Sequence, residues 1–222
     1  MRTLYQMPLS PFSRKVSFFL REKNIDFEIR NEPVWEKREK FIKLNPAGKV
    51  PVFIDDDGIA ISESNAICEF IEEKTPEPNL IGKDIYSKAE IRRIVGWFDD
   101  KFAKEVMSKL IYEKIFKNFS NLGAPDSQVI QDGVRNLRNH MQYICFLIEK
   151  RKWLAGDDFS FADITAASFI SAIDYIGDIA WEDYQEAKTW YVRIKSRKSF
   201  KPILEEKIAN FPPVEHYSNL DF

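Results

Sequence analysis

Ser10 is the residue best placed to do chemistry in this sequence, because it follows a strand-like segment and opens a helix. Residues 3–7 read as a short strand, and apolar residues recur at helical spacing over 12–20. A hydroxyl at a helix N-terminus favours a thiolate through a hydrogen bond and the helix dipole. It can equally cap the helix, since Ser is a favoured N-cap. Ser13, one turn further on, and Tyr5, inside the strand, are the alternative hydroxyls.

Glu63 and Ser64 form a second polar pair, at the point where a strand over 59–61 gives way to a helical pattern. The free backbone N–H groups of a helix start suit a carboxylate, and the Ser64 hydroxyl adds a donor. Glu63 could pair with an ammonium group of the same ligand. The alternative is structural: Ser64 is an N-cap, and Glu63 is an acid that complements the helix dipole.

Ser160 and Asp163 form the clearest helix start in the chain. The Ser160 hydroxyl can accept from the backbone N–H of Asp163, whose carboxylate can reach back to Ser160; Phe159 and Ile164 sit at the staple positions. Residues 164–175 are apolar nearly all round, so this helix is expected to be the buried centre of the second half of the chain.

Composition excludes several classes of function. The net charge of -2 argues against a nucleic-acid footprint, and no apolar run reaches the length of a membrane span. The first residues are strand-like and show no secretory pattern, which predicts a cytoplasmic protein. The two cysteines and two histidines have no metal-ligand spacing, so we expect no metal and two reduced thiols.

The order of elements predicts two domains. Strand and helix signals follow the order βαβ and then ββα up to about residue 75, which is the thioredoxin arrangement. Thr75-Pro76-Glu77-Pro78 cannot be regular helix, so the linker is placed there. The rest of the chain has helical periodicity. We therefore expect a thioredoxin-like α+β domain over 1–76 and an all-helical domain over 84–222.

These motifs together resemble the glutathione transferases. The resemblance is carried by Ser10-Pro11-Phe12, by the run from Asn45 to Pro51, by Glu63-Ser64 and by Ser160-Phe161-Ala162-Asp163, in order over nearly the whole chain. Each motif alone is weak, whereas the ordered set is specific for the two-domain fold.

The resemblance implies a site for glutathione, as a co-substrate rather than a bound cofactor. Pro51 would follow a cis peptide bond, so that the backbone of Val50 could pair with the cysteinyl unit. Glu63 and Ser64 would hold the γ-glutamyl end. Ser10 would activate the thiol, as in serine-type transferases that conjugate or reduce electrophiles. Without the resemblance, an ordinary trans proline at a strand's first position is the expectation.

A narrower resemblance points to a different class of function. Asp174-Tyr175-Ile176-Gly177-Asp178, the Trp190-Tyr191 region and the last seven residues are similar to transferase-like division proteins of alphaproteobacteria (FzlA-type). In that subgroup the fold serves to bind the tubulin-like division protein FtsZ. The resemblance implies a homodimeric module that acts on the FtsZ filament, with a conjugating enzyme as the alternative.

The C-terminal tail is unusual for a disordered end, because it carries three large apolar residues in its last six. One interpretation is that the tail after Pro212-Pro213, which should end the last helix, packs back on the protein. The other is that it docks a partner, with Leu220 and Phe222 as anchors and Asp221 setting the register.

Overall fold

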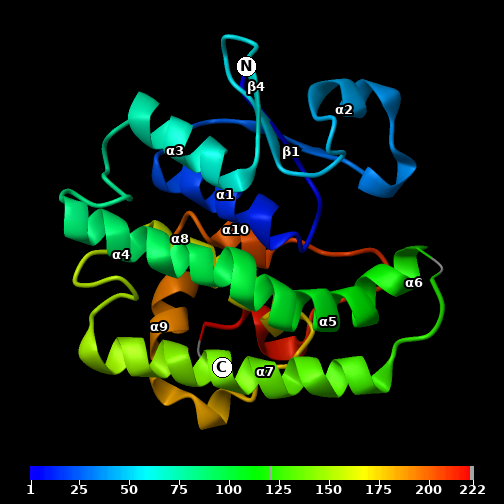
Figure 1. The fold of residues 1–222 in the computed structure, drawn as a ribbon, viewed down its shortest axis with the longest axis vertical. Helices are drawn as coiled ribbons and strands as arrows, with labels where there is room; N and C mark the ends of the chain where they lie inside the picture. The colour runs from blue at the N-terminus through cyan, green and yellow to red at the C-terminus, as the bar shows by residue number, and fades with distance from the viewer. Residues whose placement is uncertain (121, 221–222) are drawn as a thin grey trace.

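A computed structural model of the chain describes residues 1–120 and 122–220 (Figure 1). Its N-terminal part is a four-stranded mixed sheet with helices, in the strand order β2-β1-β3-β4. β1 is parallel to β2 and antiparallel to β3, which is antiparallel to β4. This is the predicted βαβ-ββα order. Its elements are β1 (Thr3–Gln6), α1 (Pro11–Glu22), β2 (Glu28–Asn31), the 3-10 turn η1 (Val34–Glu36), α2 (Glu39–Leu44), β3 (Val52–Ile54), β4 (Ala60–Ser62) and α3 (Ser64–Lys74).

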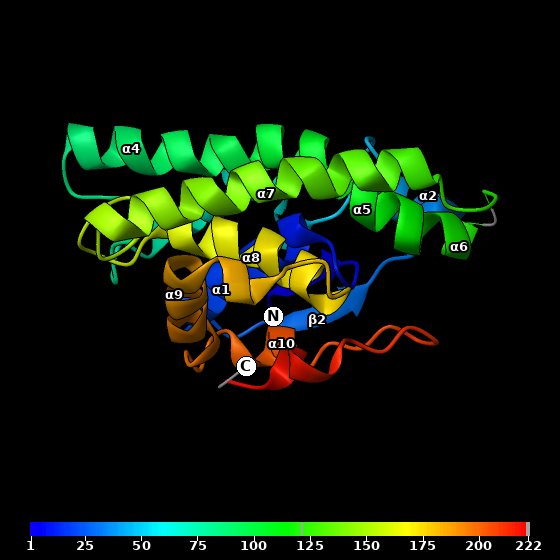
Figure 2. The same cartoon turned by 90° about the horizontal axis from the view of Figure 1, so that it is seen from below.

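The C-terminal part is helical, as the periodicity predicted (Figures 1 and 2). One continuous helical path leads into a loop, and α7 returns alongside it. Among the described residues, none of the helices combines the length and the apolar character needed to span a membrane. The elements are α4 (Ile85–Gly96), the π-helical η2 (Trp97–Met107), α5 (Ser108–Ile111), the π-helical η3 (Tyr112–Phe116), α6 (Lys117–Ser120), α7 (Ser127–Lys150), α8 (Phe161–Tyr175), η4 (Trp181–Asp183), α9 (Gln185–Lys195), α10 (Lys201–Leu204) and η5 (Glu215–Ser218).

Helix α8 is the centre of the helical part, and all of its residues are buried. Its start carries the reciprocal hydrogen bonds expected from the Ser160–Asp163 spacing, with Ser160 N donating to Asp163 Oδ2 at 3.1 Å. Asp163 Oδ1 also accepts from Leu154 N at 3.0 Å and from Trp190 Nε1 at 2.9 Å. Burial raises the pKa of Asp163 to about 6, although these donors favour its charged form.

Helix α1 lies between the sheet and α8, so it joins the two parts of the molecule (Figures 1 and 2). Its aromatic residues meet those of α8 edge to face: Phe12 packs on Phe169 at 5.3 Å and Phe19 on Phe161 at 5.2 Å between ring centroids. Such contacts add to the burial of apolar surface and fix the orientation of the rings.

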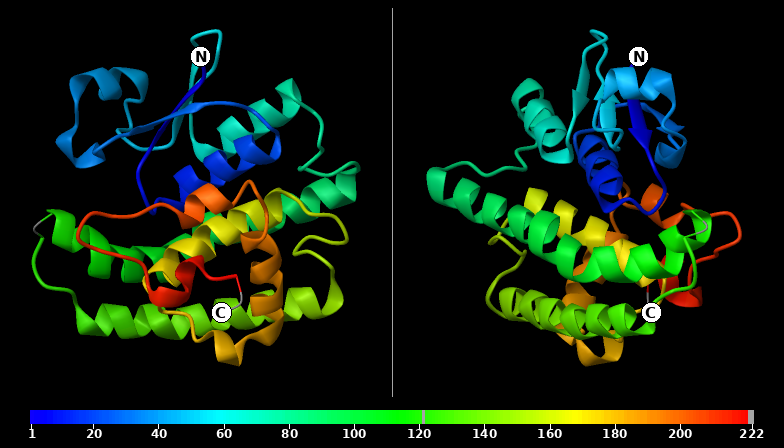
Figure 3. Two further views of the ribbon diagram at one scale, coloured as in Figure 1. Left: turned by 180° about the vertical axis from the view of Figure 1, so that it is seen from behind. Right: turned by 45° about the vertical axis from the view of Figure 1, so that its right-hand side comes forward.

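The C-terminal segment folds back on the helical part (Figure 3). Tyr217 is fully buried, its hydroxyl donates to Ile203 O at 3.3 Å, and Val214 N donates to Tyr175 O at 3.2 Å. Packing on the protein therefore explains why the tail carries the apolar Tyr217, whereas Leu220 stays 37% exposed. Asp221 and Phe222 lie outside the described residues.

The expectation that the two prolines end the last α-helix is wrong. α10 ends at Leu204, and a tight turn joins Ile208 to Phe211 before Pro212. Asn210 takes a positive φ of 64° in this turn, a conformation that Asn tolerates better than most residues. The chain has therefore left the helix before it reaches the prolines.

His140 forms a second buried polar cluster, between η2 and α7. Trp97 Nε1 donates to His140 Nδ1 at 3.0 Å, so the ring proton lies on Nε2, which is 3.0 Å from a Glu105 carboxylate oxygen. Burial lowers the pKa of His140, while Glu105 opposes this shift and Lys101 adds to it. Protonation of Nδ1 would break the hydrogen bond from Trp97.

Replacing Asp163 by Asn should destabilise the protein, because an amide group would face N–H donors in place of one acceptor oxygen. We expect a loss of about 1–3 kcal/mol in the free energy of unfolding. At roughly 2–4 °C per kcal/mol for a chain of this size, calorimetry at pH 7 would resolve it. Asp26→Asn, at an exposed position, is the control. Equal melting temperatures for the two variants would contradict a stabilising role of the cap.

Because its pKa is lowered in the folded protein, His140 should make the protein less stable as the pH falls. In the unfolded chain a histidine binds its proton near pH 6.5, above the folded value, so this contribution is lost as pH falls below about 6.5. Urea denaturation at pH 7 and pH 5 should show a larger loss for the wild type than for His140→Gln, which can keep both hydrogen bonds. An equal loss of stability between pH 7 and pH 5 in the two proteins would contradict the lowered pKa of His140.

Candidate functional site

The sheet register gathers the predicted site residues at one edge. Val52 of β3 pairs with Tyr5 of β1 and with Ser62 of β4. Because β3 is antiparallel to both neighbours, the ends of β1 and β4 and the start of β3 share this edge of the sheet. Ser10 follows β1, Pro51 precedes β3, and Glu63 follows β4, so three distant segments meet there.

Ser10 is the N-cap of α1. Its Oγ accepts from Ser13 N at 3.3 Å, and the residue is buried. Leu9, with φ at 60°, makes the sharp turn that brings the chain from β1 into the helix. Among the described residues, no group accepts the Ser10 hydroxyl proton, so capping and donation to a ligand are compatible in one side chain.

A cavity of about 320 Å³ opens beside Ser10, between the two parts of the molecule. Its lining is almost entirely apolar, and it takes one wall from the β1–α1 turn and the opposite wall from the helical part. Trp35, about half exposed, stands at its side. A ligand atom held by the Ser10 hydroxyl would therefore lie next to a space suited to an apolar group. The lining residues are Met7, Pro8, Leu9, Ser10, Pro11, Phe12, Trp35, Ile111, Ile115, Phe116 and Ile208.

The Val50–Pro51 peptide bond is cis, as the family resemblance implied. The loop before it is held by Asn45, whose Nδ2 donates to Lys49 O at 2.7 Å and whose Oδ1 accepts from Ala47 N at 3.2 Å. Gly48 takes a φ of 64° in this loop. These contacts position the start of β3 beside the β1–α1 turn.

Glu63 has a backbone conformation that is rare outside glycine, with φ at 71° and ψ at 121°. It occupies the N-cap position of α3, yet its side chain makes no capping hydrogen bond and is exposed. The first backbone N–H groups of α3 are thus left without a side-chain cap, and Ser64 lies buried among them. Such a helix start can receive a carboxylate.

The structure separates Ser10 from its two alternatives. Ser13 is buried, and its Oγ has no hydrogen-bond partner among the described residues, but it does not line the apolar cavity. Tyr5 faces a different cavity, beside Phe41 and Arg30, whose Nη1 lies 3.4 Å from the Tyr5 hydroxyl. Ser10 is therefore the one of the three that reaches the space between the domains. Val50, Pro51, Glu63 and Ser64 lie outside its lining.

Sequence reasoning missed the residues that complete the cavity. Ile111, Ile115 and Phe116 belong to a helical stripe, and such stripes indicate a core more often than a site. Ile208 lies in a tight turn 198 positions after Ser10, and no local signal predicts that it joins the same wall.

The two cysteines are not candidates for catalysis. Burial raises the pKa of the Cys68 thiol, which has no exposed surface, and it raises the pKa of the half-buried Cys145 as well. Both are unpaired thiols. A raised pKa leaves them protonated and poorly nucleophilic near neutral pH.

Comparison with known proteins supports the same architecture. The chain is 44% identical to FtsZ-localized protein A of Caulobacter vibrioides, over 100% of this chain and 98% of that protein. The solved structure of FzlA from C. crescentus matches with a TM-score of 0.98 at 44% identity, covering 100% of this chain and 99% of that one. A glutathione S-transferase from Rhodospirillum rubrum F11 matches with a TM-score of 0.97 at 48% identity, over the whole of both chains.

Two family models divide the chain between them. The model of the glutathione S-transferase N-terminal domain matches residues 4–79, and that of the C-terminal domain matches residues 100–198. Together with the full-length relatives and the sheet-plus-helical fold, these matches leave one assignment: the chain belongs to the glutathione S-transferase family, as a protein of the FzlA type.

Proposed function

We propose that this protein is a cytoplasmic, homodimeric binding module that acts on the FtsZ division filament. The observation that carries the proposal is the 44% identity to FtsZ-localized protein A, which extends over the whole of this chain. Similarity confined to the fold would also fit any other transferase, whereas this match includes the C-terminal segment.

The exposed end of the tail is the candidate partner surface. Tyr217 is buried and anchors the segment, while Leu220 remains 37% exposed three residues later. An apolar side chain held at the surface by a packed neighbour is already partly ordered, which lowers the entropic cost of binding. Leu220, together with Asp221 and Phe222 beyond the described part, would contact FtsZ.

Removing Leu220 to Phe222 should weaken co-sedimentation with polymerised FtsZ by at least about tenfold, since a hot-spot residue contributes on the order of 2 kcal/mol. The melting temperature should not change, because Tyr217 and η5 are kept. Leu220→Asp should act in the same way, and Leu122→Asp, at another exposed leucine, is the matched control. Light scattering of the same samples should give the mass of a dimer.

The outcomes of this experiment are distinct. A wild-type protein that stays in the supernatant would contradict the FtsZ function itself. A truncated protein that pellets like the wild type would move the contact away from the tail. A monomer mass would contradict the dimer only.

A second candidate function is that of a serine-type glutathione transferase. The observation that favours it is the Ser10 hydroxyl, which lies at the start of α1 with its proton free for a ligand and an apolar cavity beside it. Glutathione would bind along the sheet edge, with its cysteinyl unit at Val50 and Pro51 and its γ-glutamyl end at Glu63 and Ser64. An apolar electrophile would occupy the cavity.

If glutathione is turned over, Ser10→Ala should lower kcat in an aryl-halide conjugation assay far more than it weakens glutathione binding. The hydroxyl acts on the thiolate alone, and one pKa unit corresponds to about 1.4 kcal/mol, or tenfold in rate. Ser10→Thr keeps both the hydroxyl and a capping oxygen, so it should retain activity and control for the lost cap. Equal activity of Ser10→Ala would exclude Ser10 as the activating group.

A further inference from the structure

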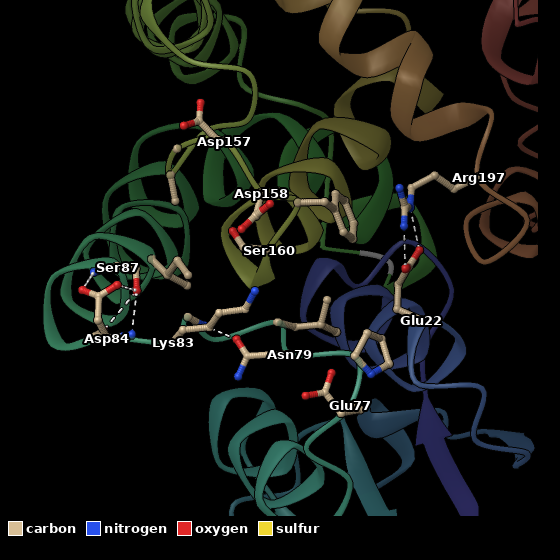
Figure 4. A pocket seen from close by; sticks show the side chains of 17 residues that line it. Glu22, Glu77, Asn79, Lys83, Asp84, Ser87, Asp157, Asp158, Ser160 and Arg197 are labelled. Atoms are coloured by element: carbon tan, nitrogen blue, oxygen red, sulfur yellow. Dashed lines mark hydrogen bonds and ion pairs between the residues drawn. The ribbon is translucent and has the colours of Figure 1, made fainter.

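The chain after α10 forms part of the wall of the Ser10 cavity and then returns to the end of α8 (Figure 3). Ile208 contributes to the wall, whereas Tyr217 is fully buried against the helical part. Before α10 the chain is fixed, because Arg197 makes two hydrogen bonds of 2.7 Å to Glu22 of α1 (Figure 4). Beyond α10, residues 205–219 of the C-terminal segment need contacts of their own to stay in place.

Tyr175, the last residue of α8, contacts both halves of this segment. Its hydroxyl accepts a hydrogen bond from Ile208 N at 3.0 Å and donates one to Phe211 O at 2.7 Å. Its backbone oxygen accepts from Val214 N at 3.2 Å. Its ring stacks on that of Phe211 and meets that of Tyr217 edge to face, at 5.1 Å between centroids. One buried residue thus holds both the cavity wall and the base of the tail.

The segment is seated closely on the protein. A Cβ atom at Gly177, where φ is 77°, would lie 2.6 Å from Val214 Cγ1, so only glycine leaves room for the chain there. At its start the segment is held by Glu206, which accepts from Arg14 Nε at 3.0 Å and from Gln6 Nε2 at 3.3 Å. Its regular structure is limited to the 3-10 turn η5 and one isolated bridge. The position of the segment therefore depends on these side-chain and backbone contacts.

These contacts link two binding surfaces. A ligand in the Ser10 cavity touches Ile208 only while the segment is docked, so it binds the docked state more tightly. A partner at Leu220 favours the same state, because the docked Tyr217 restrains the residues that follow it. Two ligands that favour one state strengthen each other's binding by the same factor.

We propose that Tyr175 couples the Ser10 cavity to the tail, so that an apolar ligand in the cavity orders residues 214–219 and strengthens binding of FtsZ. The ordering of the tail is a property of this fold, whereas its effect on FtsZ rests on the function proposed above.

Hydrogen exchange of the full-length protein, with and without saturating 2-naphthol, tests the coupling in the absence of FtsZ. This probe is neutral and aromatic at pH 7, which suits the apolar lining, and its own fluorescence reports its binding. It should slow exchange of the Val214 and Tyr217 amides severalfold, since both are hydrogen-bonded only while the segment is docked. Neither residue lines the cavity, so direct shielding by the probe does not produce this protection.

Two variants remove different contacts in the proposed chain. Tyr175→Phe keeps the ring contacts and removes the hydroxyl that joins Ile208 N to Phe211 O, whereas Ile208→Ala keeps the hydroxyl and removes the contact with the probe. Both should lose the protection at saturating probe. Tyr143→Phe, the control, removes a hydroxyl that accepts from Arg93 and should keep it. If Tyr175→Phe does not fold, Ile208→Ala decides.

Co-sedimentation with polymerised FtsZ tests the consequence for the partner. Saturating 2-naphthol should tighten binding severalfold in the wild type and in Tyr143→Phe, but not in the other two variants. Equal pelleting of the wild type with and without the probe would refute the effect on FtsZ. A wild type that never pellets would contradict the FtsZ function itself, and the exchange data alone would then decide the coupling.

Three results of the exchange experiment would overturn the coupling. The first is that 2-naphthol does not bind the wild type. The second is unchanged exchange of the Val214 and Tyr217 amides while the probe is bound. The third is the same protection in Tyr175→Phe and Ile208→Ala as in the wild type, because the tail would then respond by a route that does not use these contacts.

Discussion

The position of α1 is the constraint on which the rest of the structure depends. This helix is buried between the sheet and α8, yet its inner face carries Arg14 and Lys15, both almost fully buried. A buried cation without a partner costs several kcal/mol, so each must find its anion in a fixed place. Lys15 Nζ lies 2.7 Å from the Asp99 carboxylate and 2.8 Å from Asn65 Oδ1. Arg14 bonds to Glu206 at 3.0 Å and to Ser171 at 2.9 Å.

These partners lie on α3, η2, α8 and the C-terminal segment, so satisfying two cations of one helix orients both parts of the protein. The Ser10 cavity follows from that orientation. Ser10 stands at the start of α1, and the helical part is held so that Ile111, Ile115 and Phe116 face it. Ile208 is brought to the same wall two residues after Glu206, the anion that pairs with Arg14. The apolar cleft is thus a consequence of a polar interface.

The two ends of α1 lie in different surroundings. Its N-terminal end borders the apolar cavity beside Ser10, whereas its C-terminal end is joined to the segment after α9 by the Glu22–Arg197 ion pair. The Asp163 carboxylate holds the loop before α8, because it accepts hydrogen bonds from Leu154 N and Ser160 N.

Local patterns in the sequence predicted most of the helices and strands and several residues of the candidate site. Strand alternation, helical periodicity, the prolines of the linker and the Ser160–Asp163 spacing are local signals, because they depend on hydrogen bonds and side-chain directions within a few residues. Ser10, Glu63 and Ser64 were predicted in this way, whereas Pro51 and its cis bond came from the family resemblance.

Which of these residues line the same cavity depends on the tertiary structure alone. Ser10 opens to the cleft while Tyr5 turns to another cavity, and Ile208 joins the cleft from the far end of the chain. The end of α10 at Leu204 and the burial of Tyr217 also depend on the tertiary structure. Such outcomes depend on contacts between residues far apart in sequence, such as Arg14 with Glu206. Local propensity carries no information about these contacts, because the free energy that selects them comes from burial and pairing across the whole molecule.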